Sequence, residues 1–332
     1  MKIIIIICIL FISGIFLQAR IITVDKIAFQ GDYTNLQDAY DAANSGDTLY
    51  VYPYAEPYYD ITINKRIIII GSGGWKIDEN TTLTTKISYV DDVNAFMIFS
   101  TGSEGSVIKG FDGFFWAKIY VDNISIENNC IRQIDISDSC RNITIRGNYF
   151  EGYFSYFITI ASGSDVLITN NLFEQVNPNA CECIYDNNQI SNITINHNVF
   201  SSTGNTMNIR NSNCSIENNI NVLGWIHYGT GCTFFNNICN STQLPEGNEN
   251  IRNMDMSTVF IDYDNGNYHL KPNSPAKGSG KNGVDMGIYG GSTPFVDGGF
   301  PGIPSIIELD ADHLGSKQSG IKVKIKAKSN KE

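Results

Sequence analysis

Three side chains suited to acid–base chemistry fall at corresponding places in three short runs of the sequence. Tyr185, Arg210 and His227 belong to residues 183–186, 206–210 and 225–228, where apolar and polar residues alternate. A histidine or a tyrosine can remove a proton, and a guanidinium can neutralise a carboxylate beside the carbon that loses it. These three residues are therefore our candidate catalytic residues, for proton abstraction next to a sugar carboxylate.

Aromatic and polar neighbours of these residues have the chemistry to hold a sugar. Trp225 and Phe157 could cover the face of a sugar ring, since an aromatic side chain offers a large apolar surface. Asp186 and Asn208 could bond to hydroxyl groups, because a carboxylate accepts hydrogen bonds and an amide both donates and accepts them. We take these four residues as candidate substrate-binding residues.

The period of a β-strand decides whether these side chains share one face. If Ile184 and Ile226 point inward, the alternation of a strand turns Tyr185 and His227 outward. A register slip of one residue would bury each of them instead. The alternative interpretation is a solvated sheet face on which unrelated polar side chains gather without a ligand.

A repeated segment must position these strands. Its pattern is Ile-x-Ile-x-x-Asn-x-Phe, seen most clearly in residues 143–150, and its copies are separated by 19, 23, 27, 21 and 18 residues. Self-similarity at such a period, with short strands and no helical periodicity between them, predicts a solenoid of stacked coils with parallel sheets. The asparagines of the repeat are Asn129, Asn148, Asn171, Asn198, Asn219 and Asn237.

These asparagines have a structural explanation. Stacked amides can bond to one another while buried, because each carries donors and an acceptor. Asparagine also tolerates the left-handed backbone of a sharp turn. We therefore interpret the column as a structural ladder and not as a set of ligand contacts.

The ends of the chain differ from the repeats. Residues 1–19 combine one lysine with a short apolar run, which predicts a secretory signal peptide. We expect a β-helix over residues 20–297, with a cap at about 27–75 and a closing segment at about 260–295. Thr34 and Gln37 fit a capping box that opens a helix in the cap. Residues 298–332 should form a β-hairpin-like tail, since residues 321–328 alternate apolar residues with lysine.

The net charge and the apolar content limit the classes of molecule that the chain can bind. A formal net charge of −11 argues against nucleic acid or an anionic membrane as partner, because both attract lysine and arginine clusters. The acidic balance is compatible with Ca²⁺, but no calcium motif supports it, so we expect no cofactor and no metal site. The part after the signal peptide has no apolar run long enough to span a membrane. We expect this mature chain to be a monomer.

The cysteines allow two interpretations. Seven remain after the signal peptide, an odd number, which argues against a full disulfide framework. Cys214 and Cys232 occupy the same inward position of neighbouring repeats, so a disulfide is sterically possible. We favour the alternative, a column of free buried cysteines.

Together, these segments resemble a known family. The asparagine-ended repeats, the opening residues 33–51, and Tyr268-His269-Leu270 with Asp285-Met286-Gly287 are similar to secreted right-handed parallel β-helix proteins of the pectate-lyase-like superfamily from bacteria. The resemblance covers about residues 27–295 and implies an all-β fold, a right-handed parallel β-helix with an N-terminal capping helix. It also implies a carbohydrate-facing role.

The catalytic motifs of that superfamily are missing. Of the aspartate and histidine motifs of polygalacturonase-like enzymes, only Asp91-Asp92 is present, and the arginine motifs of pectate lyases are absent. We therefore expect a secreted, extracellular or cell-surface protein, or a periplasmic one, that binds polysaccharide or a cell-surface glycan along one side of the solenoid. Catalysis is left open, and the alternative is a polysaccharide lyase or glycoside hydrolase acting on a uronate polymer.

Overall fold

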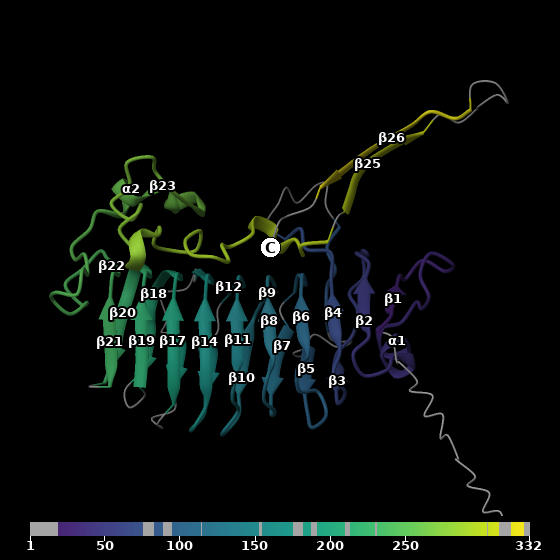
Figure 1. Ribbon diagram of the computed structural model, residues 1–332, viewed down its shortest axis with the longest axis horizontal. Coiled ribbons are helices and arrows are strands. Elements are labelled where there is room, and N and C mark those ends of the chain that lie inside the picture. The colour runs from purple at the N-terminus through teal and green to yellow at the C-terminus, as the bar shows by residue number, and fades with distance from the viewer. Residues whose placement is uncertain are drawn as a thin grey trace, which may run out of the picture.

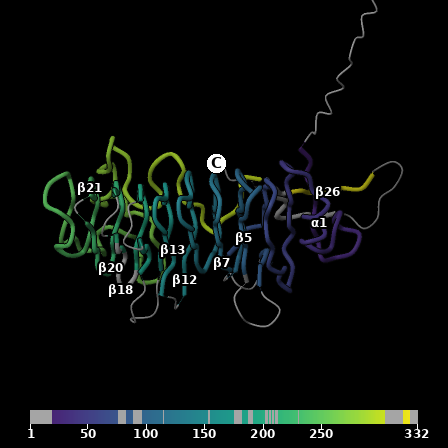
Figure 2. Tube along the Cα trace, turned by 90° about the horizontal axis from the view of Figure 1, so that it is seen from below, coloured from purple at the N-terminus to yellow at the C-terminus, as the bar shows by residue number. Residues whose placement is uncertain are grey.

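The chain forms a parallel β-helix, as predicted. The computed structural model describes residues 19–75, 83–88, 95–113, 115–152, 155–174, 182–186, 191–209, 213–229, 231–303, 305–311 and 320–328. Its coils lie side by side along one axis (Figures 1 and 2). Except for Ala19, the expected signal peptide lies outside these residues. No helix of the described part is long and apolar enough to cross a membrane.

The first sheet collects the strand that precedes each asparagine turn. Neighbouring strands pair in parallel, and in the regular repeats the isoleucines of each pattern face the core. Pairs such as Ile145 with Ile126 lie in register, so equivalent residues stack from coil to coil. The strands are, in order, β1 (Ile21–Val24), β2 (Thr48–Val51), β4 (Ile68–Ile70), β6 (Val107–Lys109), β8 (Ser125–Glu127), β11 (Ile143–Arg146), β14 (Asp165–Thr169), β17 (Asn192–Asn196), β19 (Asn213–Glu217) and β21 (Cys232–Phe235).

The second sheet collects the strands that follow the turn. Short strands come directly after it, and longer strands then return along the opposite side of the core. The short strands are β9 (Cys130–Ile131), β12 (Tyr149–Glu151), β15 (Leu172–Glu174) and β22 (Ile238–Cys239). The strands on the opposite side are β3 (Ile61–Ile63), which is also short, β5 (Ala95–Phe99), β7 (Phe115–Ile119), β10 (Gln133–Ile136), β13 (Tyr156–Ile160), β16 (Glu182–Asp186), β18 (Val199–Ile209) and β20 (Ile220–Tyr228).

The repeated asparagines bond to one another through the buried turn. Asn148 Nδ2 donates to Asn171 Oδ1 at 3.1 Å, and Asn171 Nδ2 donates to Asn198 Oδ1 at 3.0 Å. The series runs from Asn129 to Asn237 and continues to Asn250, one step further than the sequence pattern indicated. The residue before each of the six repeat asparagines has a positive φ, which closes the turn. Phe150, Phe173 and Phe200 stack behind this ladder with ring centroids 4.7 and 4.8 Å apart.

A second apolar cluster lies outside the asparagine turns. It consists of the residue that directly follows each ladder asparagine, together with Trp75 and the closing part of the chain. The closing part contains α2 (Met256–Val259) and an antiparallel pair, β23 (Phe260–Asp262) and β24 (Asn267–Leu270). The stacked members are Cys130, Tyr149, Leu172, Val199, Ile220 and Ile238, and those that cover them include Met256, Phe260, Tyr268, Met286, Ile288 and Phe295.

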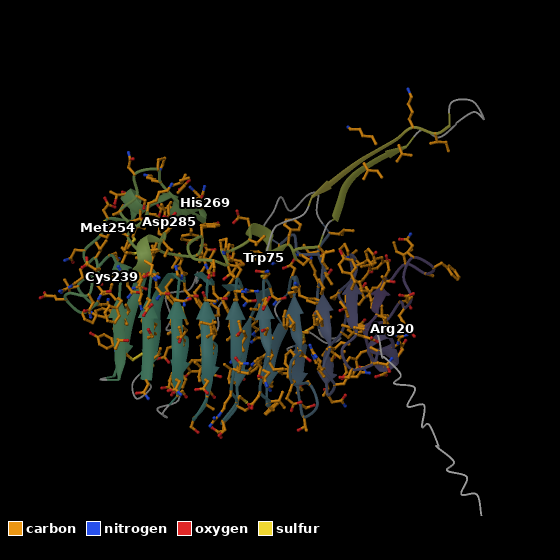
Figure 3. All side chains as sticks on the ribbon, viewed as in Figure 1. Arg20, Trp75, Cys239, Met254, His269 and Asp285 are labelled. Carbon is orange, nitrogen blue, oxygen red and sulfur yellow. A yellow bond between two sulfur atoms is a disulfide. The ribbon has the colours of Figure 1, made fainter. Side chains whose placement is uncertain are left out.

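Residues 278–300, here called the strap, run back along the turns against the order of the coils. Gly287 N donates to Asn218 O, and further along Asn170 Nδ2 donates to Ile288 O, both at 2.8 Å. At its far end Gly298 O accepts from Gly74 N. Figure 1 shows this return, and Figure 3 places Trp75 at the same edge. The strap therefore connects the last coils to the early ones.

Two sequence-based expectations about the ends of the solenoid are wrong. Helix α1 (Leu36–Ala42) is capped by Asn35, not Thr34, because Asn35 Oδ1 accepts from the backbone of Gln37 and Asp38. Cys214 and Cys232 form a disulfide, not a column of free cysteines, because their Cα atoms lie 4.4 Å apart in register. The other cysteines of the described part are buried: Cys130, Cys140, Cys183 and Cys239.

The tail beyond the strap is an antiparallel hairpin. Strands β25 (Ser305–Ala311) and β26 (Val323–Lys328) pair with each other, and the hairpin projects away from the solenoid (Figure 1). Val323 and Ile325 are more than half exposed.

Candidate functional site

Three of the candidate residues, Tyr185, Trp225 and His227, fall on the outer side of the second sheet, in a set that we call the outer sheet face. The face consists of the outward side chains of β5, β7, β10, β13, β16 and β20. It has two rows, because each of these strands except β10 contributes two outward positions; β10 contributes only Asp135, since Gln133 is buried. Its members are Phe96, Ile98, Trp116, Lys118, Asp135, Tyr156, Thr159, Glu182, Tyr185, Trp225 and His227.

The first row contains Tyr185 and His227. Asp135 pairs in register with Thr159, and Thr159 with Tyr185. Tyr185 pairs with Asn208, and Asn208 pairs with His227. Tyr185 is partly exposed and His227 is exposed, so the structure brings both to the outer face. Because β18 lies between them, their backbones are about 10 Å apart, two strand spacings.

The second row is mainly aromatic. Phe96 pairs with Trp116, and their ring centroids lie 5.4 Å apart. Tyr156 pairs with Glu182. Trp225, at the other end of the row, is 61% exposed. The row thus offers apolar ring surface at both ends and in the middle.

Contacts within and between the two rows fix several of these side chains. The ammonium of Lys118 lies 4.3 Å from the ring centroid of Phe96 and 4.7 Å from that of Trp116. Asp135 Oδ1 accepts from Thr159 Oγ1 at 2.6 Å and from Gln133 Nε2 at 2.9 Å. These contacts reduce the freedom that the side chains would lose on binding a ligand.

Tyr156 and Tyr185 form an aromatic pair in the middle of the face. Their ring centroids are 4.8 Å apart with planes tilted by 34°. Burial raises the pKa of Tyr156, and the neighbouring Glu182 and Tyr185 raise it further. The Tyr156 hydroxyl therefore stays protonated at neutral pH and can donate a hydrogen bond.

Phe157 and Asp186 do not belong to the face, contrary to the sequence-based prediction. Phe157 is fully buried, with its ring centroid 5.7 Å from that of Phe150. Asp186 is only 1% exposed. The error with Phe157 arises because β13 buries two consecutive residues, Phe157 and Ile158, so strict alternation fails at its first residues. Asp186 follows the alternation and takes the inward position after Tyr185.

The two remaining candidates are placed only in part. The backbone of Asn208 lies between Tyr185 and His227, as expected, and Arg210 lies outside the described residues. The proposed base and cation are therefore not assembled by the described part of the chain. Proton abstraction by this group remains a hypothesis.

Several members of the face escaped the sequence analysis. Phe96, Trp116 and Lys118 lie in residues 95–119, where the repeat is irregular and no outward positions were assigned. The signal was nevertheless present, since Phe96-x-Ile98 and Trp116-x-Lys118 alternate with buried residues. Tyr156 and Glu182 were missed for the same reason that Phe157 was misplaced.

Among the described residues, no group of three or more histidine, cysteine, aspartate or glutamate side chains is arranged to hold a metal ion. Comparison with known proteins adds no assignment: no family model matches the chain, and no curated protein is significantly similar to it.

Proposed function

We propose that the chain is a secreted or surface-displayed protein that binds polysaccharide along the outer sheet face. The proposal rests on one observation: the exposed ring of Trp225 and the partly exposed rings of Trp116, Tyr156 and Tyr185 lie on a single sheet together with charged and hydroxyl side chains. Rings supply broad contact at a low entropic cost, and the polar groups fix orientation. A monomer suffices for this role.

The shape of the face suits a polymer. Successive coils repeat outward positions about 4.8 Å apart along the solenoid axis. A chain of sugars lying along that axis would meet a ring or a polar group at each coil. Lys118 and His227 are the basic members that could contact carboxylates, while Asp135 and Glu182 could accept from hydroxyls. An acidic polysaccharide is therefore compatible with the face.

Glycoside hydrolases need two carboxyl groups about 5–9.5 Å apart. On the outer sheet face, Asp135 and Glu182 lie on β10 and β16, with β13 between them, and in different rows. The glycoside hydrolase alternative would rest on these two residues. The lyase alternative rests on the outward placement of Tyr185 and His227.

A binding titration with matched variants tests the proposal. We would measure the affinity of the purified chain for polygalacturonate, alginate and a neutral glucan by calorimetry. Trp116→Ala and Trp225→Ala should each weaken binding at least tenfold, since each removes a ring from the face. Phe235→Ala is the matched control, because Phe235 is an exposed ring on β21 of the other sheet. Equal losses in all three variants, or no binding to any polymer, would reject the proposal.

The same samples test the lyase alternative. A lyase forms unsaturated products that absorb ultraviolet light. On the binding proposal, no such absorbance should develop with either uronate polymer. Turnover that is lost in both Tyr185→Phe and His227→Ala would instead establish catalysis at this face.

A further inference from the structure

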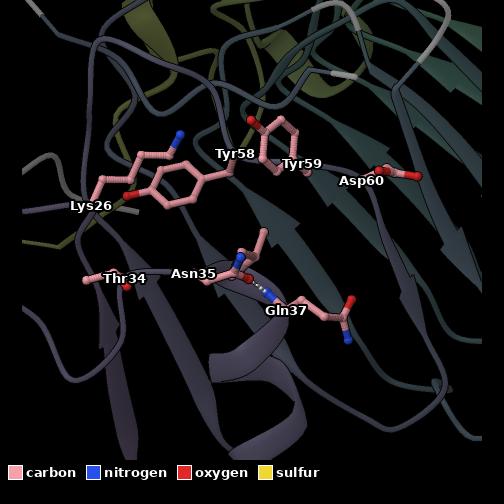
Figure 4. A pocket seen from close by; sticks show the side chains of 8 residues that line it. Lys26, Thr34, Asn35, Gln37, Tyr58, Tyr59 and Asp60 are labelled. Carbon is pink, nitrogen blue, oxygen red and sulfur yellow. Dashed lines mark hydrogen bonds between the residues drawn. The ribbon is translucent and has the colours of Figure 1, made fainter. Parts of the chain in front are cut away.

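A small pocket lies at the N-terminal end of the solenoid, outside the residues discussed so far. It has a volume of about 200 Å³. Lys26, Tyr58 and Tyr59 line one side, Thr34, Asn35 and Gln37 line the other, and Asp60 lies at its edge (Figure 4). Pockets for drug-sized ligands usually exceed about 300 Å³, so this one suits a single small ring.

Lys26 gives the pocket a cation held among aromatic rings. Its ammonium lies 5.3, 5.5 and 5.8 Å from the ring centroids of Tyr58, Tyr59 and Tyr54. The same group donates to Pro57 O at 2.6 Å, which fixes it in place and leaves two further N–H donors. Burial lowers the pKa of Lys26, although nearby Glu56 acts in the opposite direction. A partly desolvated ammonium binds a carboxylate more strongly than a fully hydrated one.

The other lining groups match the remaining parts of a sugar. Tyr59 is 47% exposed, so its ring can cover a sugar ring. Gln37 Nε2 donates to Asp41, which leaves Gln37 Oε1 as an acceptor for a hydroxyl. Asn35 uses its Oδ1 to cap α1, so its Nδ2 is the group that can donate to a ligand. The exposed carboxylate of Asp60 is a further acceptor.

The pocket lies in line with the aromatic row of the outer sheet face. Ile61 of β3 pairs with Met97 of β5. Extending this register by one residue places Asp60 beside Phe96, the first ring of that row. Asp60 and Phe96 both lie one residue before a buried residue of their strands, and both are outward. The pocket therefore closes the N-terminal end of the row.

We propose that this pocket binds the terminal hexuronate of an acidic polysaccharide, with its carboxylate on Lys26 and its ring on Tyr59. The inference rests on the proposed function, since it gives a binding site to the end of a polysaccharide whose length lies along the outer sheet face. A terminal subsite of this kind fixes the direction in which the polymer lies. The subsite also lets a short uronate bind in the pocket without contacting the outer sheet face.

Titration of short sugars tests the pocket separately from the face. The probes are digalacturonate and dimannuronate, with cellobiose as a neutral disaccharide of similar size. The unaltered chain should bind at least one uronate disaccharide and bind cellobiose at least tenfold more weakly. Lys26→Met and Tyr59→Ala should each weaken uronate binding at least tenfold, while Lys26→Arg should retain most of it. Tyr59 is half-exposed, so its replacement leaves the fold intact.

Lys65 provides a matched control. Its ammonium lies 4.4 Å from the ring centroid of Tyr40 and donates to Ala43 O at 2.7 Å, yet it does not line the pocket. Lys65→Met should therefore leave disaccharide affinity unchanged. Trp225→Ala should weaken binding of the polymer at the outer sheet face and leave the affinity for the disaccharide unchanged.

The outcomes separate the two proposals. If polymer binding depends on Trp116 and Trp225 but no uronate disaccharide binds, or if Lys26→Met binds the disaccharide like the unaltered chain, the pocket inference is wrong and the face proposal stands. If the disaccharide binds through Lys26 but the affinity for the polymer is unchanged in Trp116→Ala and Trp225→Ala, the face proposal is wrong and the pocket inference stands. Equal affinity for cellobiose would overturn the assignment to an acidic sugar.

Discussion

Trp75 stacks on Tyr149, with ring centroids 5.4 Å apart and planes only 14° from parallel. Trp75 comes from the early coils, whereas Tyr149 follows the ladder asparagine of a central repeat. Phe295 of the strap packs against Trp75 as well, with ring centroids 5.7 Å apart and planes inclined by 64°. The pair thus joins three parts of the chain that are far apart in sequence.

Removing this stack should destabilise the protein strongly. We expect Tyr149→Ala to lower the free energy of unfolding by about 4 kcal/mol, because a large, fully buried ring leaves a cavity. Chemical denaturation followed by circular dichroism measures the loss. Tyr120→Ala is the control, since Tyr120 is 55% exposed, and it should change stability by less than about 0.5 kcal/mol. Similar values for the two variants would contradict the buried role of Tyr149.

Replacing an asparagine of the ladder should also destabilise the protein. In Asn171→Ala, the Oδ1 that accepts from Asn148 and the Nδ2 that donates to Asn198 are both lost. Buried partners are left unsatisfied, so we expect a loss of about 3 kcal/mol in urea denaturation. Asn192→Ala removes an exposed asparagine from the next coil and should cost less than about 0.5 kcal/mol. A ladder variant as stable as this control would show that the amides are replaceable.

Truncations should separate the hairpin from the strap. A chain that ends at Gly302 lacks the projecting hairpin and should keep its melting temperature and its polymer affinity. A chain that ends at Lys277 also loses Met286, Ile288 and Phe295, each buried. Burying one such side chain contributes about 1.5–3 kcal/mol, so this chain should lose more than about 4 kcal/mol and bind a hydrophobic dye. Equal melting temperatures would show that the strap is dispensable.

The ionised side chain of Asp47 should stabilise the protein, so the free energy of unfolding should fall as the pH is lowered. Burial alone would raise the pKa of Asp47, but bonds from Arg20 and from the backbone of Asn44 outweigh it and hold the pKa below 3.8. The ionised carboxylate therefore stabilises the native state above the unfolded pKa, near 4, and this contribution is lost as pH falls through the lower native value.

Asp47→Asn makes this contribution measurable. Its urea midpoint should lie below that of the unaltered chain at pH 7, and the two should converge as the pH approaches 2. Asp38→Asn, at an exposed position in α1, is the control. A difference that persists unchanged at low pH would mean that the carboxylate charge is not the cause.

The repeat made the scaffold predictable because its physical demands are local. Each inward isoleucine and each turn asparagine meets its own equivalent in the next coil, so one pattern determines both stacking and register. Tyr185, Trp225 and His227 could be placed outward for that reason. Near Trp116 the repeat is irregular, so the sequence pattern assigned neither a strand nor an outward face there.

The errors came from contacts that no local pattern contains. Phe157 is buried because β13 turns two consecutive residues inward near its start, where Phe157 packs against Phe150 and Phe173 of the core. The repeat pattern specifies no residue type at Tyr149, yet Tyr149 is buried beneath a strap formed more than a hundred residues later. Asn35 replaces Thr34 as cap because its amide oxygen reaches two backbone donors at once.

The direction of the strap also bears on how the protein is made. Gly298 bonds to Gly74, so the segment that covers these early coils is synthesised only after all the coils of the solenoid. Coils can stack while synthesis proceeds, since domains generally fold from the N-terminus during translation. The apolar flank beside Trp75 and Tyr149 nevertheless remains uncovered until the strap has emerged. The growing chain therefore exposes this apolar side while its coils are being made.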